Sequence, residues 1–200
     1  MKIILASKNQ DKIKEIGKIL NRSNRTLVTC NDMDIPEVEE TGSTFVENAI
    51  LKARSASLST GLPALADDSG IEVDYLNAEP GIKSARYSGE NATNESNNLK
   101  LLEALNGVSC KDRKACYRCV IVYMRFPDDP FPVITSGSWH GYITERLIGN
   151  NGFGYDPLFY LPEYDKTSAE ISSDLKNKIS HRAQALIKLE EYFEKEEVNA

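Results

Sequence analysis

KIILASKNQDKIKEIGKIL, residues 2–20, changes its pattern of apolar residues halfway along. The run KIILA at 2–6 is short and apolar, which is typical of a β-strand. From Asn9 onward the apolar spacing becomes that of one helical face. The residues at this spacing are Ile13, Ile16, Ile19 and Leu20. The stretch therefore predicts a strand, a tight turn and a helix, the unit from which α/β proteins are built.

The rest of the first half alternates extended and helical patterns in the same way. Thr44 and Glu47 form a capping-box pattern, so we expect a helix from Thr44 to about Ser59. Gly61 then ends that helix. The strands expected in this half are 26–30, 64–66 and 71–76. A sharp corner at DDSG, residues 67–70, is expected to separate the last two strands, because glycine permits such a turn.

The second half continues with a helix at 94–106, whose expected C-cap is Gly107. Two longer strands, at 115–126 and 131–144, are expected to form a hairpin around PDDP. Ser180 is expected to cap a final amphipathic helix. This order of elements predicts an α/β fold with a mixed sheet, in a chain that could be one domain or two small lobes sharing a sheet.

Composition and charge narrow the class of protein. Of the 200 residues, 40% are hydrophobic and 27% are charged, as in ordinary soluble globular proteins. The net charge of −6 argues against non-specific binding to nucleic acid or to an anionic membrane. The apolar run CVIVYM at 119–124 is far shorter than the roughly 20 residues of a membrane-spanning helix. MKIILA is also too short for a signal peptide, so we expect a cytoplasmic protein.

Two of the four cysteines form a C-x-x-C pattern, at Cys116 and Cys119, within an expected strand. Residues three apart on a strand point to opposite faces, so this pair makes a poor chelate or disulfide. A structural zinc site would also need two more ligands at suitable spacing. We therefore interpret both residues as ordinary buried thiols.

Polar residues gather first at SKNQDK, residues 7–12, between the first strand and its helix. Backbone N–H groups at a helix N-terminus favour anions, and Lys8 and Lys12 add positive charge. The stretch lacks the glycines of a Walker A loop. The alternative interpretation is a polar turn followed by a solvated helix face.

A second polar group consists of two acidic pairs, Glu39–Glu40 and Asp67–Asp68. Carboxylate oxygens suit Mg²⁺, which takes one or two protein carboxylates and completes its shell with water and substrate phosphate. Because neighbouring strand residues face opposite ways, we expect one aspartate in the site and the other behind it. The alternative interpretation is a solvated loop with an Asx-turn.

Two further polar groups lie in a glycine-rich loop and at the start of the last helix. In GFGYDP, residues 152–157, glycines allow close approach of the backbone, and Phe153 or Tyr155 offers a face for base stacking. The alternative is that these aromatic residues simply fill the core. His181 and Arg182 begin the last helix. A cation there opposes the helix dipole and costs stability, which suggests that these residues have a function. Together the four groups indicate a site for a magnesium–nucleoside triphosphate.

Several of these motifs are long enough to carry a resemblance. SKNQDKIKE, EETGSTFVENAILKA, ADDSGIEVDYL, PGIKSARYSGE, GSWHGYI, GFGYDPLF and ISHRAQAL resemble, in order, the XTP/dITP pyrophosphatase family, also called inosine triphosphate pyrophosphatases. The resemblance runs from Lys2 to about Leu189, nearly the whole chain.

The resemblance implies a magnesium-dependent, house-cleaning hydrolase. It would convert deaminated purine triphosphates (ITP, dITP, XTP) to the monophosphate and pyrophosphate, and so keep these bases out of DNA and RNA. It implies a homodimer, and for residues 1–200 a single domain with an elongated, twisted mixed α/β sheet flanked by helices, its two lobes lying around a central substrate cleft.

The resemblance also assigns residues. Asp68 matches the proton acceptor, and Glu39 and Asp68 match magnesium ligands, with Asp67 and Glu40 as further candidates. The matching substrate-binding positions are Ser7, Lys8, Asn9, Gln10, Asp11, Lys12, Lys52, Ser69, Phe153, Gly154, Tyr155, Asp156, Lys176, His181 and Arg182. The family's first loop is commonly T-G-N-x-G-K, and here Lys8 and Asp11 replace its glycines.

Two other functions remain open at this point. A related pyrophosphatase could act on modified pyrimidines or methylated bases, with a different way of recognising the base. A non-catalytic module could bind the nucleotide without cleaving it. The acidic motifs argue against this second alternative.

Overall fold

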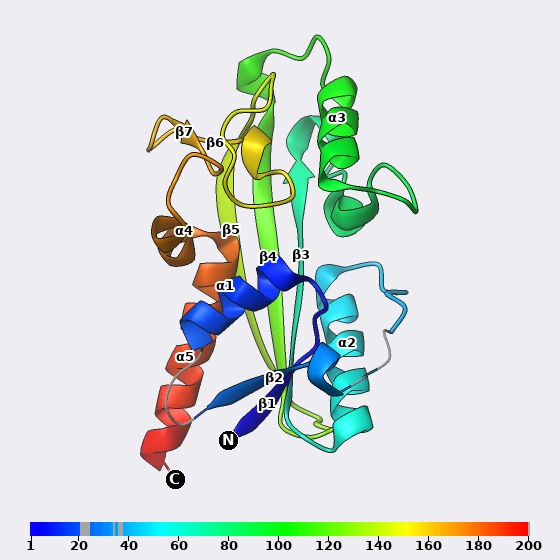
Figure 1. Cartoon of the computed structure of the whole chain (residues 1–200), viewed down its shortest axis with the longest axis vertical. Coiled ribbons are helices and arrows are strands. Elements are labelled where there is room, and N and C mark those ends of the chain that lie inside the picture. The colour runs from blue at the N-terminus through cyan, green and yellow to red at the C-terminus, as the bar shows by residue number, and fades with distance from the viewer. Residues whose placement is uncertain (21–24, 34, 36–37, 200) are drawn as a thin grey trace. The chain divides into compact units, whose positions relative to one another are not determined.

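The computed structural model describes residues 1–20, 25–33, 35 and 38–199, which form two compact units (Figure 1). The first unit comprises Met1–Asp68, Cys119–Gly137 and His181–Ala200. The second comprises Ser69–Arg118 and Ser138–Ser180. Each unit is thus built from segments that are distant in the sequence.

Within the described residues, seven strands form one mixed sheet in the order β2-β1-β3-β4-β5-β6-β7. β1 pairs in parallel with β2 and β3, whereas β6 pairs antiparallel with β5 and β7. The strands are β1 (Lys2–Leu5), β2 (Thr26–Thr29), β3 (Ala64–Val73), β4 (Lys114–Met124), β5 (Val133–Ile143), β6 (Phe159–Leu161) and β7 (Lys166–Thr167). The predicted α/β fold with a mixed sheet is confirmed.

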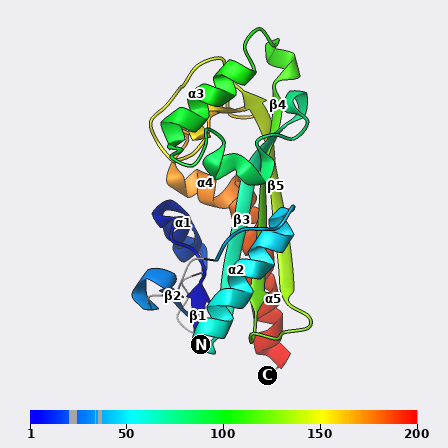
Figure 2. The same cartoon turned by 90° about the vertical axis from the view of Figure 1, so that its right-hand side faces the viewer.

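In the first unit, alternating strand residues face two different helix layers. α1 (Gln10–Leu20) and α5 (His181–Asn199) pack on one face of the sheet, against side chains such as Leu5 and Leu65. α2 (Phe45–Thr60) packs on the other face, against Ala64 and Ala66, and runs along β3 (Figure 2). Odd and even positions of β3 therefore meet different partners.

The helix starts follow the capping patterns in the sequence. The Asn9 side chain accepts hydrogen bonds from the backbone N–H of Asp11 and Lys12, both at 3.0 Å, and so caps α1. Thr44 and Glu47 form the predicted capping box at the start of α2. Gly61 ends α2 in the left-handed conformation, with φ of 68°.

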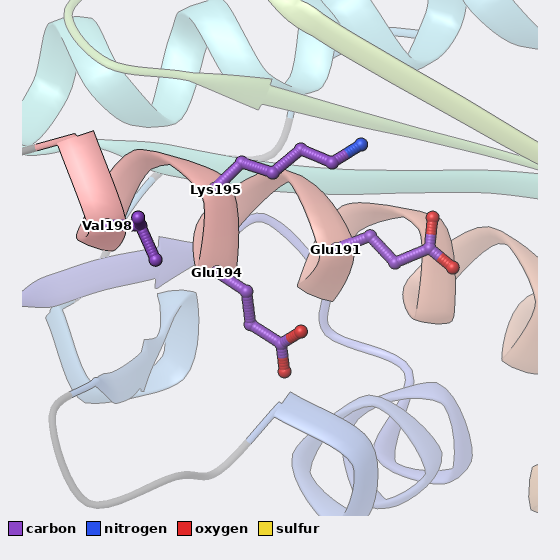
Figure 3. A pocket seen from close by; sticks show the side chains of 4 residues that line it. All are labelled: Glu191, Glu194, Lys195 and Val198. Carbon is purple, nitrogen blue, oxygen red and sulfur yellow. The ribbon is translucent and has the colours of Figure 1, made fainter.

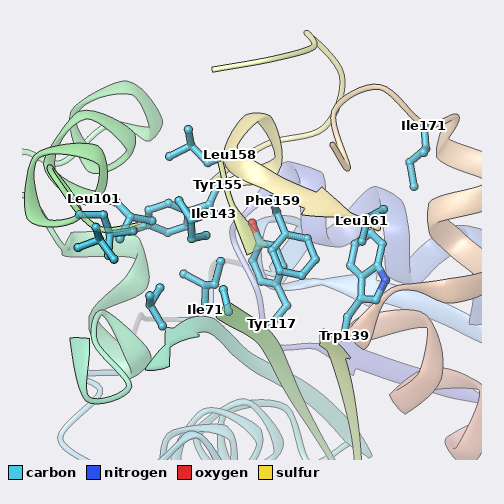
Figure 4. Packing of buried hydrophobic residues seen from close by; sticks show 14 residues of the cluster. Ile71, Leu101, Tyr117, Trp139, Ile143, Tyr155, Leu158, Phe159, Leu161 and Ile171 are labelled. Carbon is cyan, nitrogen blue, oxygen red and sulfur yellow. The ribbon is translucent and has the colours of Figure 1, made fainter. Parts of the chain in front are cut away.

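The second unit has its own apolar core, with aromatic rings at its centre (Figure 4). Tyr117 meets the ring of Phe159 edge-on at 4.7 Å, and Trp139 lies 5.2 Å from the same ring. α3 (Asn94–Ala104) contributes Leu101 to this core. A helix that the sequence did not indicate, α4 (Ser173–Ile179), lies immediately before α5 in the chain.

The prediction of a corner at DDSG is wrong. β3 continues without interruption from Ala64 to Val73, and the residues after it, Asp74–Leu76, form a 3₁₀ turn rather than a strand. The corner was expected because glycine permits a sharp turn, which would expose two charges that are costly inside a sheet. Here each aspartate is bound by at least one cationic side chain on its own face, so both can stay inside a straight strand.

One predicted helix boundary also differs from the structure, whereas the start of the last helix directly after Ser180 agrees with it. α3 ends at Ala104, with Leu105 rather than Gly107 at its C-cap. Gly107 has a left-handed φ of 78°, so the glycine serves the loop that follows. α5 begins at His181, directly after Ser180, and Ser180 is also the C-terminal cap of α4.

Candidate active site

β3 places Asp67 and Asp68 side by side in the chain but on opposite faces of the first unit's sheet. Asp67 lies two residues beyond Leu65, on the face that meets α1 and α5. Asp68 lies two residues beyond Ala66, on the face that meets α2. Both side chains are buried, so each needs a partner of opposite charge.

Asp67 binds two cations and a thiol. Its carboxylate lies 2.5 Å from Lys12 Nζ and accepts hydrogen bonds from Arg182 Nε at 3.2 Å and Cys119 Sγ at 3.0 Å. Burial alone would raise the pKa of Asp67, but Arg182 and Lys12 outweigh it and hold that pKa well below the usual carboxyl range. Asp67 is therefore a strongly favoured anion that joins α1, β3, β4 and α5.

Arg182 is held from two sides at the start of α5. Its Nε binds Asp67, and its Nη1 binds Glu15, which lies one turn after Lys12 on α1. Burial disfavours the charged guanidinium, yet Asp67 and Glu15 raise the pKa of Arg182. The unfavourable position of a cation at a helix N-terminus is thus offset by two carboxylates.

Asp68 shares one ammonium group with a second acid. Lys52 Nζ, on α2, lies 2.8 Å from Asp68 Oδ1 and 2.8 Å from Glu40 Oε1. Burial raises the pKa of Asp68, although Lys52 opposes this shift. Burial opposes the charged form of Lys52 as well, but Asp68 and Glu40 raise its pKa. One ammonium shared by two carboxylates leaves this group of three side chains with excess negative charge, which favours the protonated form of Lys52.

This excess charge bears on metal binding. Within the described parts of the chain, no three Asp, Glu, His or Cys side chains come together as a ready-made metal site. Mg²⁺ needs only one or two protein carboxylates, because water and phosphate oxygens supply its other ligands. Glu40 and Asp68, already bound to one cationic group, therefore fit a Mg²⁺ ion. Glu39, the ligand suggested by the resemblance, is exposed, whereas Glu40 is half-buried.

The second unit contains a separate buried ion pair in the predicted base-binding loop. Asp156 binds Lys176 Nζ at 2.5 Å, Ser168 Oγ at 2.8 Å and the backbone N–H of Phe153 at 2.8 Å. Gly152 has a φ of 76°, and a Cβ there would lie 2.0 Å from the Asp156 carboxylate. Asp156 therefore shapes the glycine-rich loop from inside.

The two aromatic residues of this loop differ in their surroundings. Tyr155 is buried in the core, and its hydroxyl donates to the Ser84 carbonyl at 2.8 Å. Phe153 is half-buried, and the Lys176 ammonium lies 4.7 Å from the centre of its ring. Of the two, Phe153 is the ring with an exposed part.

The remaining predicted residues lie in loops, at the starts of α1 and α5, and within β3. The first loop is largely open to solvent: Lys8, Asn9 and Gln10 are exposed, whereas Ser7 and Asp11 are half-buried. In the second unit Ser69 and Gly154 are half-buried, and in the first unit His181 is buried.

Glu15, Cys119 and Ser168 also bind candidate site residues, although they are not among the predicted ones. For Glu15 a signal was present, because it lies three residues after Lys12 on the same helix. No comparable spacing links Cys119 to Asp67, or Ser168 to Asp156, because strand pairing and loop folding bring them together.

A shallow depression lies elsewhere on the first unit, along α5 (Figure 3). It is lined by Glu191, Glu194, Lys195 and Val198, none of which is a predicted site residue. In the described part of the chain, no helix has both the length and the apolar character needed to cross a membrane.

Known proteins resemble this chain over almost its full length. The curated dITP/XTP pyrophosphatase of Thioalkalivibrio sulfidiphilus is 54% identical over 186 residues, covering 93% of this chain and 95% of that protein. The dITP/XTP pyrophosphatase of Salmonella typhimurium is 50% identical over 185 residues, covering 92% and 94%.

Solved structures agree with this likeness. A HAM1 protein from Coxiella burnetii matches with a TM-score of 0.91 and 47% identity, covering 98% of this chain and 99% of that one. The Ham1 protein of Staphylococcus aureus matches with a TM-score of 0.87 and 43% identity, covering 98% and 100%. The sequence profile of the Ham1 family matches residues 3–192, and this chain belongs to that family.

Proposed function

We propose that this chain is a hydrolase that converts ITP, dITP and XTP to the nucleoside monophosphate and pyrophosphate with the help of Mg²⁺. The observation that carries the proposal is the buried pair Asp67–Asp68, with a separate cation partner for each member. The relatives named dITP/XTP pyrophosphatase, at 54% and 50% identity, support the substrate class.

Asp68 is the proposed general base. It is buried, and its pKa is raised by that burial, so its carboxylate is a stronger proton acceptor than an exposed aspartate. Asp68 would take a proton from the water that attacks the α-phosphorus. Mg²⁺, held by Asp68 and Glu40 or Glu39, would supply positive charge to the phosphate oxygens.

The lysines are the proposed partners of the phosphates. Lys12 and Lys52 carry the positive charge that would stabilise the pyrophosphate leaving group. By resemblance, Lys176 and the loop Phe153–Asp156 of the second unit are also substrate contacts. These lysines are bound to carboxylates in the structure, so the triphosphate would replace Asp or Glu oxygens as their acceptor.

Arg182 and His181 are the proposed readers of the base. Inosine and xanthine have a 6-keto acceptor where adenine has a 6-amino donor, and a guanidinium offers only donors. Adenine would leave a buried donor without an acceptor, a mismatch that can discriminate by about 10⁴. Glu15 and Asp67 hold the guanidinium in place, so it would meet the base in a fixed orientation.

An assay of pyrophosphate release with ITP, dITP, XTP, GTP and ATP, with and without Mg²⁺, tests the proposal. We expect release from the first three substrates only when Mg²⁺ is present, and little release from ATP. Equal turnover of ATP and ITP would contradict the proposed reading of the base. Binding of ITP without release would favour the non-catalytic module, and activity confined to modified pyrimidines or methylated bases would favour the related pyrophosphatase.

A further inference from the structure

Lys52 is bound on both sides by the carboxylates proposed to hold the metal. Its Nζ lies 2.8 Å from one oxygen of Asp68 and 2.8 Å from one oxygen of Glu40. The Asp68 side chain is 9% exposed and the Lys52 side chain 15%, so solvent screens this contact only weakly. The ammonium therefore occupies the position between these two carboxylates that a cation would take.

Helix α2, which carries Lys52, and the loop that carries Glu40 are both held in place by contacts within the first unit. The neighbours of Lys52 on α2, Ala49 and Ala53, are fully buried in the core between α2 and the sheet. The loop that carries Glu40 is tied to α2, because the backbone N–H of Gly42 donates to Asn48 Oδ1 at 2.8 Å. A movement of the flexible Lys52 side chain could therefore vacate the position while α2 and the loop stay in place.

The charges of Asp68, Glu40 and Lys52 favour replacement of the Lys52 ammonium by a divalent cation. Two carboxylates carry two negative charges, and Lys52 supplies one positive charge. A divalent cation would neutralise the pair completely, but it would leave the displaced ammonium next to a metal ion. A polyphosphate chain is the ligand that would accept both of these positive charges.

We propose that Lys52 is a placeholder for Mg²⁺ in the metal-free protein, and that Mg²⁺ and the triphosphate bind cooperatively because the displaced Lys52 then binds the phosphates. The inference rests on the proposed function, whose Mg²⁺ and triphosphate it links. Such coupling is reciprocal, so the triphosphate strengthens Mg²⁺ binding by the same factor as Mg²⁺ strengthens triphosphate binding. Couplings of this kind typically amount to about 5–150-fold in affinity.

The test is a calorimetric titration of the free protein with Mg²⁺, repeated in the presence of an ITP analogue that has a methylene group between its α- and β-phosphorus atoms. For the wild type we expect weak Mg²⁺ binding alone and at least about fivefold tighter binding with the analogue. Lys52→Met removes the competing ammonium, so Mg²⁺ should bind the free variant severalfold more tightly and gain much less from the analogue.

Three variants make the result specific. Lys52→Arg keeps a competing cation and should behave like the wild type in the titration without nucleotide. Lys12→Met removes a charge that is bound to Asp67 on the other face of β3, and it should tighten Mg²⁺ binding less than Lys52→Met does. Arg54→Gln removes an exposed charge from the same helix and should leave Mg²⁺ affinity unchanged. Thermal unfolding of each variant establishes that it is folded.

The inference is overturned if Lys52→Met binds Mg²⁺ no more tightly than the wild type in the absence of nucleotide. It is also overturned if Lys12→Met tightens binding equally, since the effect would then be one of total charge. Neither result depends on turnover of ITP. The absence of pyrophosphate release from wild-type protein would instead contradict the proposed function.

Discussion

At the scale of single residues, Asp67 and Asp68 show how neighbouring side chains of one type acquire different chemistry. Asp67 is bound by Lys12, Arg182 and Cys119, and its low pKa keeps it ionised. The pKa of Asp68 is shifted in the opposite direction by burial. A low pKa suits a structural anion, whereas a raised pKa suits a general base.

Asp68→Asn should lower kcat for ITP by at least about a hundredfold, because it removes the proposed proton acceptor. The measurement is steady-state pyrophosphate release at saturating Mg²⁺. Asp74→Asn is the matched control, since Asp74 is an exposed acid just beyond β3 and should leave kcat unchanged. Wild-type turnover by Asp68→Asn would remove Asp68 from the role of base.

Asp67→Asn should lower the free energy of unfolding by about 3 kcal/mol, because it removes the carboxylate that binds half-buried Lys12 and leaves buried Arg182 with Glu15 as its only described carboxylate partner. The pKa of Asp67 is depressed in the folded protein, so its contribution is present above the unfolded pKa of about 3.9 and is lost as pH falls below that value. Urea unfolding of both proteins at several pH values measures this. A difference in stability that persists at pH values below the folded pKa would contradict this assignment.

Sequence patterns could select candidate polar residues, but they could not predict which of these side chains contact each other. Strand alternation placed Asp67 and Asp68 on opposite faces, because the period of a strand is fixed by its backbone. Nothing local indicates that Glu40 rather than Glu39 reaches Lys52, since both lie in an irregular loop. The thiol contact of Cys119 with Asp67 depends on how two strands pair, which is a property of the tertiary fold.

At the scale of elements, the first unit depends on a close approach of β5 to α5. A Cβ on Gly137 would lie 2.0 Å from the His181 carbonyl oxygen and 3.0 Å from the Ala185 backbone nitrogen. Thr135 Oγ1 donates to the Ala185 carbonyl at 2.8 Å, so the same strand also holds the helix by a hydrogen bond. The first turn of α5, which carries His181 and Arg182, is thereby positioned by β5.

Gly137→Ala should therefore destabilise the protein by about 1–3 kcal/mol, because the added methyl group meets backbone atoms that cannot move aside easily. It should also raise KM for ITP more than it lowers kcat, since it displaces the proposed base-reading residues. Gly17→Ala is the contrasting control: a Cβ there has nothing within 4 Å, and alanine favours the helix by about 0.5–1 kcal/mol. Equal stability of the two variants would show that α5 does not depend on this contact.

Helix starts were the best-predicted elements, because their signals are local. The capping box of Thr44 and Glu47 was confirmed at α2. The short helix α4 was missed, because its seven residues are too few to show a clear helical period. The DDSG corner was predicted wrongly for a related reason: the cations that make a straight strand possible come from distant segments, at Lys12, Lys52 and Arg182.

At the scale of the whole molecule, the sequence indicated the fold class but could not define the two compact units. Each unit combines segments from different parts of the chain, and β3, β4 and β5 contribute residues to both. The sequence contains no recognisable linker between the units, because the chain passes from one unit to the other within β3, β4 and β5. The order of the seven strands likewise depends on pairing between distant segments.

The resemblance leads us to predict a homodimer in solution. Light scattering coupled to size-exclusion chromatography should give twice the mass of one chain at micromolar concentration. The measurement should be repeated with and without Mg²⁺ and nucleotide, to separate assembly from substrate binding. A mass equal to one chain at every concentration would contradict the prediction.

The uninterrupted strand β3 has a consequence for how this protein can vary in length. Deleting or inserting a single residue between Leu65 and Asp67 would exchange the two faces of everything that follows, so Asp67 would meet Lys52 and Asp68 would meet Lys12 and Arg182. The apolar residues beyond them would turn with them. A substitution in β3 can be compensated by a change in one partner residue. The insertion or deletion of one residue cannot, because it moves every later side chain of the strand to the other face. Length changes are therefore expected in the loops of this protein and not between its two aspartates and the core residues that precede them.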